Sequence, residues 1–300
     1  MPSEQRHNLQ IAIFFIVTGS AFGAACNILA KIAQSELLGA PLHPLQVSNG
    51  RFLFAFLTIS SFVIIQRPTF TKPNLPLHIF RTFCGYSGIS LMFAATALIP
   101  ISDATALGFL NPIFGLFFAI PILKEKIGKL RWFATAIGFV GAMILIRPTN
   151  STFEPGAIFA LIAALSIGLE LILIKFLTGK EKPVQILLIN NTIGLTISTL
   201  VMINFWAPPT MMQWIVLAAI GIFMITTQTC NIYALRNADA SFIVPFTFSS
   251  LIFVSIYDYF IFSSYPDYIS ILGAAVILSG VGLIAWQEIK KQKNSLSFDF

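Results

Sequence analysis

Long apolar runs recur along the whole chain and define the elements that the sequence predicts. Each run has about 20 residues, enough for a helix to cross roughly 30 Å of hydrocarbon. We expect helices because backbone groups in lipid must find hydrogen-bond partners within their own segment. Runs such as IAIFFIV (11–17) lack the alternation of apolar and polar residues that a membrane β-barrel strand requires. The ten predicted spans are 9–30, 45–65, 78–98, 101–122, 131–146, 156–177, 184–204, 211–234, 240–262 and 268–286.

The composition supports this interpretation. Apolar residues make up 56% of the chain and charged residues only 10%, and the mean hydropathy is +0.84. A soluble protein carries about 25% charged residues. This chain could not cover its surface with polar groups, so we predict an all-α integral membrane protein that has the lipid bilayer as a partner.

The positive charges indicate the orientation of the spans. If the N-terminus is cytoplasmic, all but three of the 18 Lys and Arg residues fall inside or at inner helix ends, the exceptions being Lys31, Arg51 and Arg147. The positive-inside rule expects this bias in short loops, so both termini are predicted to be cytoplasmic (N-in/C-in). The pI of 9.3 then reflects topology. No loop interleaves basic with aromatic residues, so no nucleic-acid partner is predicted.

A weak internal repeat relates residues 104–145 to residues 243–284. A shift of 139 residues without a gap aligns Glu125 with Ser264, Ala134 with Gly273 and Gly141 with Gly280. The ten spans then form two halves of five, residues 1–150 and 151–300, the second including a cytoplasmic tail. Because five is odd, the halves enter the membrane in opposite senses. Inverted repeats place a substrate site near the midplane, between halves that open alternately to each side.

Two prolines support a cavity between the halves. Pro112 in the fourth span deprives the carbonyl of Gly108 of its helical partner, and Pro245 in the ninth span does the same to Ser241. Such breaks persist in a membrane where neighbouring helices or a wet cavity satisfy the freed carbonyl. A kink made only for packing explains either proline alone. Their occurrence in corresponding helices of the two halves favours helix breaks that take part in gating.

The stretch GYSG (85–88) has the form that surrounds the serine of rhomboid-type membrane proteases. A serine nucleophile needs a base within hydrogen-bond reach. His78, nine residues before Ser87 on the same helix, lies roughly 13 Å away at 1.5 Å per residue, and neither other histidine falls within a span. The GxxG spacing also lets two helices pack closely. We therefore favour a packing role over an intramembrane protease.

Other catalytic chemistry finds little support in the sequence. Asp258 in IYDYF resembles half of an intramembrane aspartyl protease site, but that chemistry needs two carboxylates, and the usual GxGD half is absent. No GxxxxGK[ST] loop and no Cys/His cluster occurs. We predict no catalytic residue, no cofactor and no metal site.

Glu170 is the most informative polar residue within the spans. A carboxylate at that depth costs at least a few kcal/mol unless it faces water, a partner or a proton. One interpretation is a group that binds a cation or couples transport to protons. The alternative is a carboxyl group that reaches the cytoplasmic vestibule near Lys175.

Further polar residues in the spans predict a cavity, although hydrogen bonds between helices would explain each residue alone. Several share the inner half of the membrane with Glu170, some lie in the outer half, and Asn111 is central. Tyr86, Phe109 and Phe248 are candidates for ring contacts with a substrate. The predicted cavity residues are Glu170, Arg51, Asn27, Tyr86, Asn111, Asn190, Gln228 and Asn231.

Across nearly its whole length the chain resembles the drug/metabolite transporter superfamily, EamA type. The resemblance is carried by NPIFGLFFAIPILKEKIGKLRW (111–132), GFVGAMILIRP (138–148), YALRNADASFIVPFTF (233–248) and FSSYPD (262–267). HPLQVSNGRFLFA (43–55) looks closest to the branch that includes bacterial S-adenosylmethionine carriers. The family pattern is matched by Arg51, Pro112, Glu125 and Pro245. Ser264 departs from it where Glu is usual, and Glu170 departs where an aromatic or apolar residue is usual.

We therefore predict a secondary transporter of a small polar or zwitterionic metabolite in the bacterial inner membrane. It would work by alternating access, coupled to protons or by exchange. Glu170 would suit a cationic centre and Arg51 a carboxylate, as in an amino acid or its S-adenosyl derivative. An exporter of amino acids or hydrophobic drugs is the alternative within carriers. The direction of transport and the assembly, including a homodimer, are left open.

Overall fold

The computed structural model describes residues 2–96, 98–99, 101–147, 155–262 and 268–296, and within them helices are the only regular elements. The α-helices are α1 Pro2–Ala33, α2 Pro44–Gln66, α3 Leu75–Thr96, α4 Ile101–Gly108, α5 Asn111–Leu123, α6 Lys129–Ile146, α7 Pro155–Thr178, α8 Pro183–Met202, α9 Met211–Asn237, α10 Ala240–Ile243, α11 Ser249–Phe262 and α12 Tyr268–Leu296. Three short 3-10 helices are η1 Glu36–Leu38, η2 Ile203–Phe205 and η3 Val244–Phe248.

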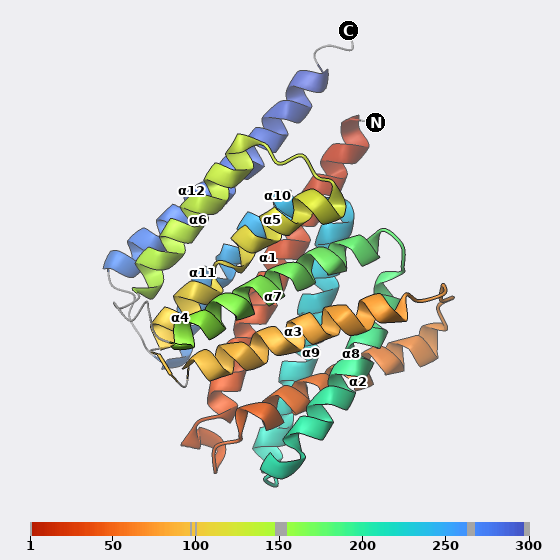
Figure 1. Ribbon diagram of the computed structural model, residues 1–300, viewed down its shortest axis with the longest axis vertical. Helices are drawn as coiled ribbons and strands as arrows, with labels where there is room; N and C mark the ends of the chain where they lie inside the picture. The colour runs from red at the N-terminus through yellow and green to blue at the C-terminus, as the bar shows by residue number, and fades with distance from the viewer. Residues whose placement is uncertain (1, 97, 100, 148–154, 263–267, 297–300) are drawn as a thin grey trace.

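The helices lie where the apolar pattern predicts them. Seven predicted spans each fall mainly on a single α-helix, the fourth falls on α4 and α5, the seventh on α8 and η2, and the ninth on α10, η3 and α11. Among the described residues, seven helical segments are long and apolar enough to cross a membrane, and two apolar helices are shorter. The protein is thus an all-helical, multi-pass membrane protein, while the count of ten crossings and their orientation stay predictions. The start of α1 and the end of α12 lie at the same end of the bundle (Figure 1), as an even number of crossings requires.

Local sequence explains where several helices begin and end. Pro44 and Pro183 occupy the first turns of α2 and α8, where a missing N–H costs nothing. Arg67, Lys124 and Arg147 close α2, α5 and α6 in the left-handed conformation, with φ of 44°, 56° and 53°. Cations at these ends also interact favourably with the negative pole of the helix dipole.

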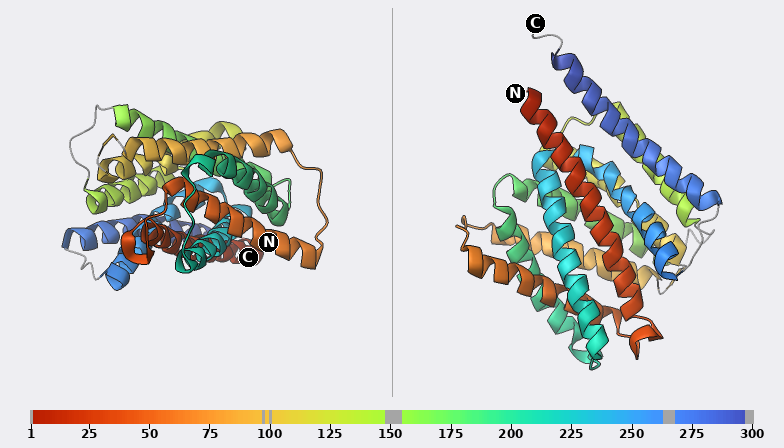
Figure 2. Two further views of the ribbon diagram at one scale, coloured as in Figure 1. Left: turned by 90° about the horizontal axis from the view of Figure 1, so that it is seen from below. Right: turned by 180° about the vertical axis from the view of Figure 1, so that it is seen from behind.

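Contacts between the helices follow a reciprocal pattern (Figures 1 and 2). Helix α1 packs along α9, and α3 packs along α7; α11 contacts α1, and α5 contacts α7. In the predicted halves, each contact joins the first span of one half to the third or fourth span of the other. Of the remaining large contacts, α2 with α8 and α6 with α12 join equivalent spans, whereas α2 with α9 is matched only by a smaller contact of α3 with α8. A pseudo-two-fold axis relating the halves would produce this pattern.

The pairing of α6 with α12 repeats the pattern at single residues. A Cβ on Gly273 would lie 3.0 Å from the Gly141 carbonyl oxygen, and a Cβ on Gly280 would lie 2.9 Å from that of Ala134. The shift of 139 residues equates Ala134 with Gly273 and Gly141 with Gly280, so each contact is the image of the other. This reciprocity supports the two-repeat organisation that we propose, with its boundary near residue 150. The predicted boundary between residues 150 and 151 lies outside the described residues.

Gly280→Ala is expected to destabilise the protein, because its Cβ would press on the backbone of α6 at Ala134 and at Gly138. Overpacking of this kind costs about 1–3 kcal/mol, which corresponds to a Tm lowered by roughly 3–8 °C. Gly282→Ala on the same helix is the matched control, since nothing lies within 4 Å of its Cβ. Thermal unfolding in detergent checks both variants, and equal Tm values would contradict the close packing.

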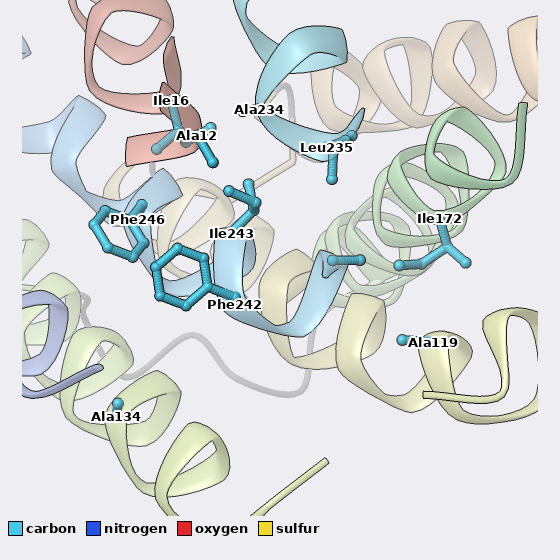
Figure 3. Packing of buried hydrophobic residues seen from close by; sticks show 11 residues of the cluster. Ala12, Ile16, Ala119, Ala134, Ile172, Ala234, Leu235, Phe242, Ile243 and Phe246 are labelled. Atoms are coloured by element: carbon cyan, nitrogen blue, oxygen red, sulfur yellow. The ribbon is translucent and has the colours of Figure 1, made fainter. Parts of the chain in front are cut away.

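The largest apolar core surrounds the break in the ninth span (Figure 3). Phe242, Ile243 and Phe246 from α10 and η3 are at most 1% exposed. They pack among Ile16 of α1 and Leu235 of α9, together with residues of α5, α6 and α7. The interruption at Pro245 is therefore embedded in protein, as irregular backbone at membrane depth must be.

Candidate functional site

The centre of the candidate site is an ion pair between α3 and α7, which lie side by side (Figure 1). Glu170 Oε1 of α7 lies 3.7 Å from Arg81 Nη1 of α3, and the two side chains are 24% and 3% exposed. A buried carboxylate requires a partner of opposite charge. The alternative partner, Lys175, instead donates to the carbonyl oxygens of Leu235 and Ala238 at 2.5 and 2.6 Å, at the end of α9.

A small cavity of about 50 Å³ opens beside this ion pair. Asn190 of α8 and Gln228 and Asn231 of α9 line it together with Arg81 and Glu170. Its apolar walls are Ile174, Ile186, Leu187 and Ile232. The structure thus brings together four of the predicted cavity residues, namely Glu170, Asn190, Gln228 and Asn231, and it adds Arg81.

Hydrogen bonds fix two of the cavity amides. Thr82 Oγ1 donates to Asn190 Oδ1 at 3.3 Å, and Asn191 Nδ2 donates to Gln228 Oε1 at 2.9 Å. The α3 and α8 walls and the α8 and α9 walls are therefore joined through polar side chains. A fixed amide presents its remaining donors and acceptors in a defined direction, which is a requirement for selective binding.

Several guanidinium donors near the cavity have no partner. Among the described residues, Nε and Nη2 of Arg81 and Nε of Arg51 are buried and receive no hydrogen-bond acceptor. An orphaned donor costs about 1–3 kcal/mol, so such groups indicate a ligand or a functional constraint. Nε and Nη2 form one edge of the Arg81 guanidinium, the edge that can bind a carboxylate through two parallel hydrogen bonds.

The other predicted cavity residues lie elsewhere. Arg51 covers the ring of Phe52 at 4.4 Å and interacts electrostatically with Glu170, but it does not line the cavity. Asn27 is exposed on α1, and Tyr86 is half-buried on α3. Asn111 donates through Nδ2 to the Gly108 carbonyl oxygen at 2.9 Å. These four residues do not line this cavity, and their contact with a substrate stays a prediction.

Both prolines mark helix breaks. Pro112 lies in the first turn of α5, directly after α4 ends at Gly108, and the side chain of Asn111 satisfies the carbonyl that the proline frees. Pro245 opens η3 between α10 and α11. The ring candidates Phe109 and Phe248 stack on each other at 5.9 Å. Phe248 is fully buried, which is typical of packing.

No cluster of His, Cys, Asp and Glu that could hold a metal ion occurs in the part of the chain that the structure describes. Asp258 pairs with Lys31 at 3.1 Å across α11 and α1. The ion pair gives Asp258 a structural role at this position, so no second carboxylate is needed to explain it.

Comparison with known proteins identifies the fold. The profile of the EamA-like transporter family matches residues 10–147 and 154–286. The chain belongs to the EamA-like transporter family. A solved crystal structure superposes with a TM-score of 0.78 over 93% of this chain and 98% of its own, at 15% sequence identity.

Curated relatives of this EamA-like chain are transporters of different metabolites. An S-adenosylmethionine uptake transporter of Rickettsia bellii is 27% identical over 89% of this chain and 92% of its own length. A riboflavin transporter of Vibrio cholerae is 27% identical over 97% and 98%. A pseudopaline exporter of Pseudomonas aeruginosa is 23% identical over 94% and 98%. The family thus identifies a transporter of small metabolites, not an enzyme.

The GYSG stretch of this EamA-like transporter packs α3 against α7. A Cβ on Gly88 would lie 2.7 Å from Ile167 Cγ1 and 3.3 Å from the Ala163 carbonyl oxygen, so only glycine allows this approach. Ser87 Oγ donates to the carbonyl oxygen of Cys84 at 3.1 Å. The packing interpretation is therefore confirmed for Gly88.

A buried polar network lies three residues before Arg81 on α3. His78 is fully buried, and its Nε2 lies 3.0 Å from Glu181 Oε2 in the α7–α8 connection. Glu181 also accepts hydrogen bonds from the Asn74 backbone N–H at 3.0 Å and from Gln185 Nε2 at 2.7 Å. Burial alone would raise the pKa of Glu181, but these hydrogen bonds outweigh burial and lower the pKa below its ordinary value. The network joins the start of α3 to the start of α8.

Glu181→Gln is expected to lower the Tm more at pH 7 than at pH 4. A depressed pKa stabilises the folded state above the ordinary carboxyl pKa, near 4.5, and that contribution disappears as the pH falls through the folded-state value. Hydrogen bonds to a charged group contribute about 1.5–3 kcal/mol. Unfolding in detergent at pH 7 and pH 4 measures the difference, with the exposed Glu36→Gln as control. A difference in Tm between the wild type and Glu181→Gln that is larger at pH 4 than at pH 7 would contradict this role.

Proposed function

We propose that the protein is a secondary carrier of a small metabolite that bears a cationic centre and a carboxylate. The observation that supports it best is the cavity in which Glu170 lies beside the unpaired edge of Arg81. In the structure the two side chains neutralise each other. A zwitterionic substrate replaces this pairing, because its cation takes Glu170 and its carboxylate takes Nε and Nη2 of Arg81.

The size of the cavity supports a cycle of alternating access. A cavity needs roughly 10–15 Å³ of solvent-accessible volume to hold one water molecule, so about 50 Å³ leaves room for a few water molecules but not for a metabolite. The helices around Glu170 must separate before a substrate binds. The reciprocal packing of the halves and the breaks at Pro112 and Pro245 supply elements that can move in this way.

The preferred substrate class is an amino acid or its S-adenosyl derivative. S-adenosylmethionine, which the Rickettsia relative is named for, carries a sulfonium, an ammonium and a carboxylate. Riboflavin, which names the Vibrio relative, has no carboxylate and would leave Arg81 unpaired. The bacterial sources of these relatives support a location in the bacterial inner membrane.

Uptake into proteoliposomes tests the proposal. Labelled S-adenosylmethionine is supplied outside, with and without the same compound preloaded, against a panel of unlabelled amino acids. Saturable uptake that preloading stimulates is expected for an exchanger, and stimulation by a pH gradient is expected for a proton-coupled carrier. Lack of uptake of both S-adenosylmethionine and every labelled amino acid would contradict the proposed substrate class.

A further inference from the structure

We propose that Gly85 is a positioning residue that sets substrate specificity by holding the Glu170 carboxylate beside Arg81. The Gly85 recess is the space that a side chain at residue 85 would fill. The inference deepens the proposed function, because it assigns the selectivity for a cationic centre to a residue that carries no functional group.

The recess is occupied by the carboxylate itself. An ideal Cβ on Gly85 would lie 2.5, 2.6 and 2.7 Å from Oε2, Cδ and Oε1 of Glu170. Real Cβ atoms essentially never approach other atoms within 3.0 Å. Even a methyl group at residue 85 therefore displaces the carboxylate.

Moving the Glu170 carboxylate does not require any backbone to move. Gly85 differs in this respect from glycines that lie directly against the backbone of a neighbouring helix. The atoms nearest to a Cβ on Gly168 are Asn111 O and Gly115 N, both backbone atoms of α5. At Gly85 the nearest atoms are the free end of a flexible side chain. An alanine at residue 85 is thus expected to preserve the helix packing and to move only the carboxylate of Glu170.

Helical geometry explains why the recess and the guanidinium act together. Arg81 and Gly85 are four residues apart on α3 and share one face. The recess lies one turn along from Arg81, and Glu170 of α7 reaches toward both. Because apolar side chains line much of the cavity, the local dielectric constant is low and a small shift of the carboxylate changes its interaction with a charge strongly.

The first experiment is independent of transport. In the wild-type background Gly85→Ala should lower the Tm of the purified protein by a few degrees, since it weakens the contact with Arg81. In a Glu170→Ala background the same change should leave the Tm equal or raise it, because alanine favours a helix over glycine. If the Tm changes of Gly85→Ala and Glu170→Ala simply added in the double variant, the positioning role would be overturned, since residues in contact are expected to show a coupling energy in such a double-mutant cycle. Gly88→Ala, which meets Ile167 instead, should be additive with Glu170→Ala.

The second experiment measures selectivity. S-adenosylmethionine and its neutral thioether analogue S-adenosylhomocysteine differ by one methyl group and one charge, and each is tested as a competitor of labelled uptake. The wild type should prefer the sulfonium by roughly tenfold, the effect of one charge-assisted interaction. Gly85→Ala should reduce this ratio to about that of Glu170→Gln, whereas Gly88→Ala should keep the wild-type ratio even if its rate falls.

The outcomes distinguish the two proposals. An unchanged ratio in Gly85→Ala would overturn the specificity role of the recess. If neither compound competes with any labelled substrate, the proposed substrate class fails, and the unfolding cycle still decides whether Gly85 positions Glu170.

Discussion

Glu170→Gln is expected to raise the KM for a substrate with a cationic centre by roughly 10–100-fold, the effect of losing about 1.5–3 kcal/mol from one interaction with a charged group. Glutamine preserves the shape of the side chain, so it still fills the space between Arg81 and Gly85. The variant therefore removes the charge from the cavity without opening a hole. Uptake of labelled S-adenosylmethionine into proteoliposomes measures the change.

Asp258→Asn is the matched control for this substitution. It also converts an acid to an amide, but Asp258 pairs with Lys31 at a more exposed position on α11. Its KM should stay within about twofold of the wild type, because exposed ion pairs contribute at most about 1 kcal/mol. Equal KM values in all three proteins would show that Glu170 does not contact the substrate.

The same variant tests the coupling role of Glu170. If its carboxyl group carries the coupling proton, a pH gradient should no longer stimulate uptake by Glu170→Gln at saturating substrate. Exchange against preloaded substrate should persist under those conditions, since it needs no net proton movement. Uptake that remains fully driven by the pH gradient would exclude Glu170 as the coupling residue.

The helices and the inner group of polar residues were predictable because lipid imposes simple rules. An apolar run long enough to cross the membrane must be helical, and each predicted span falls on helix. Polar side chains inside such runs must face protein or water. That rule is sufficient to group Glu170, Asn190, Gln228 and Asn231, which the structure places around one cavity.

Arg81 escaped prediction because its position in the sequence is ambiguous. Six residues after the start of α3, a cation normally reaches back to the cytoplasmic surface. The structure buries it against α7 instead. A signal was present, since His78, Arg81 and Gly85 recur at helical spacing and so share one face of α3.

Asn27 and Asn111 are predicted cavity residues that do not line the cavity beside Glu170. Residues four apart on a helix share one face, but the sequence does not say which neighbouring helix covers each turn of that face. On α1, Gly19 meets Asn231 and Gly23 meets Thr227 of α9, yet Asn27 one turn further is exposed. Asn111 is used locally, because Pro112 frees the carbonyl of Gly108 and the nearest amide donates to it. The hydrogen bond to this backbone carbonyl thus accounts for Asn111 without a role in binding substrate.

Arg81→Lys is expected to weaken binding of a carboxylate-bearing substrate by roughly 10–100-fold although the positive charge remains. Lysine presents a single compact ammonium, whereas the Nε and Nη2 edge of arginine matches both oxygens of a carboxylate. This edge is buried and has no partner among the described residues, so no existing hydrogen bond competes for it. Competition of labelled uptake by S-adenosylmethionine measures the loss.

A substrate analogue separates recognition of the carboxylate from a structural role of Arg81. The methyl ester of S-adenosylmethionine keeps the sulfonium but cannot accept two charge-assisted hydrogen bonds, so it should bind wild type and Arg81→Lys about equally. Arg51→Lys is the matched control, because Arg51 Nε is also unpaired but lies outside the cavity lining. If only Arg51→Lys lost the preference for S-adenosylmethionine over its methyl ester, the substrate carboxylate would bind Arg51 and not Arg81. If Arg81→Lys weakened the binding of S-adenosylmethionine and of its methyl ester equally, Arg81 would only hold Glu170 in place.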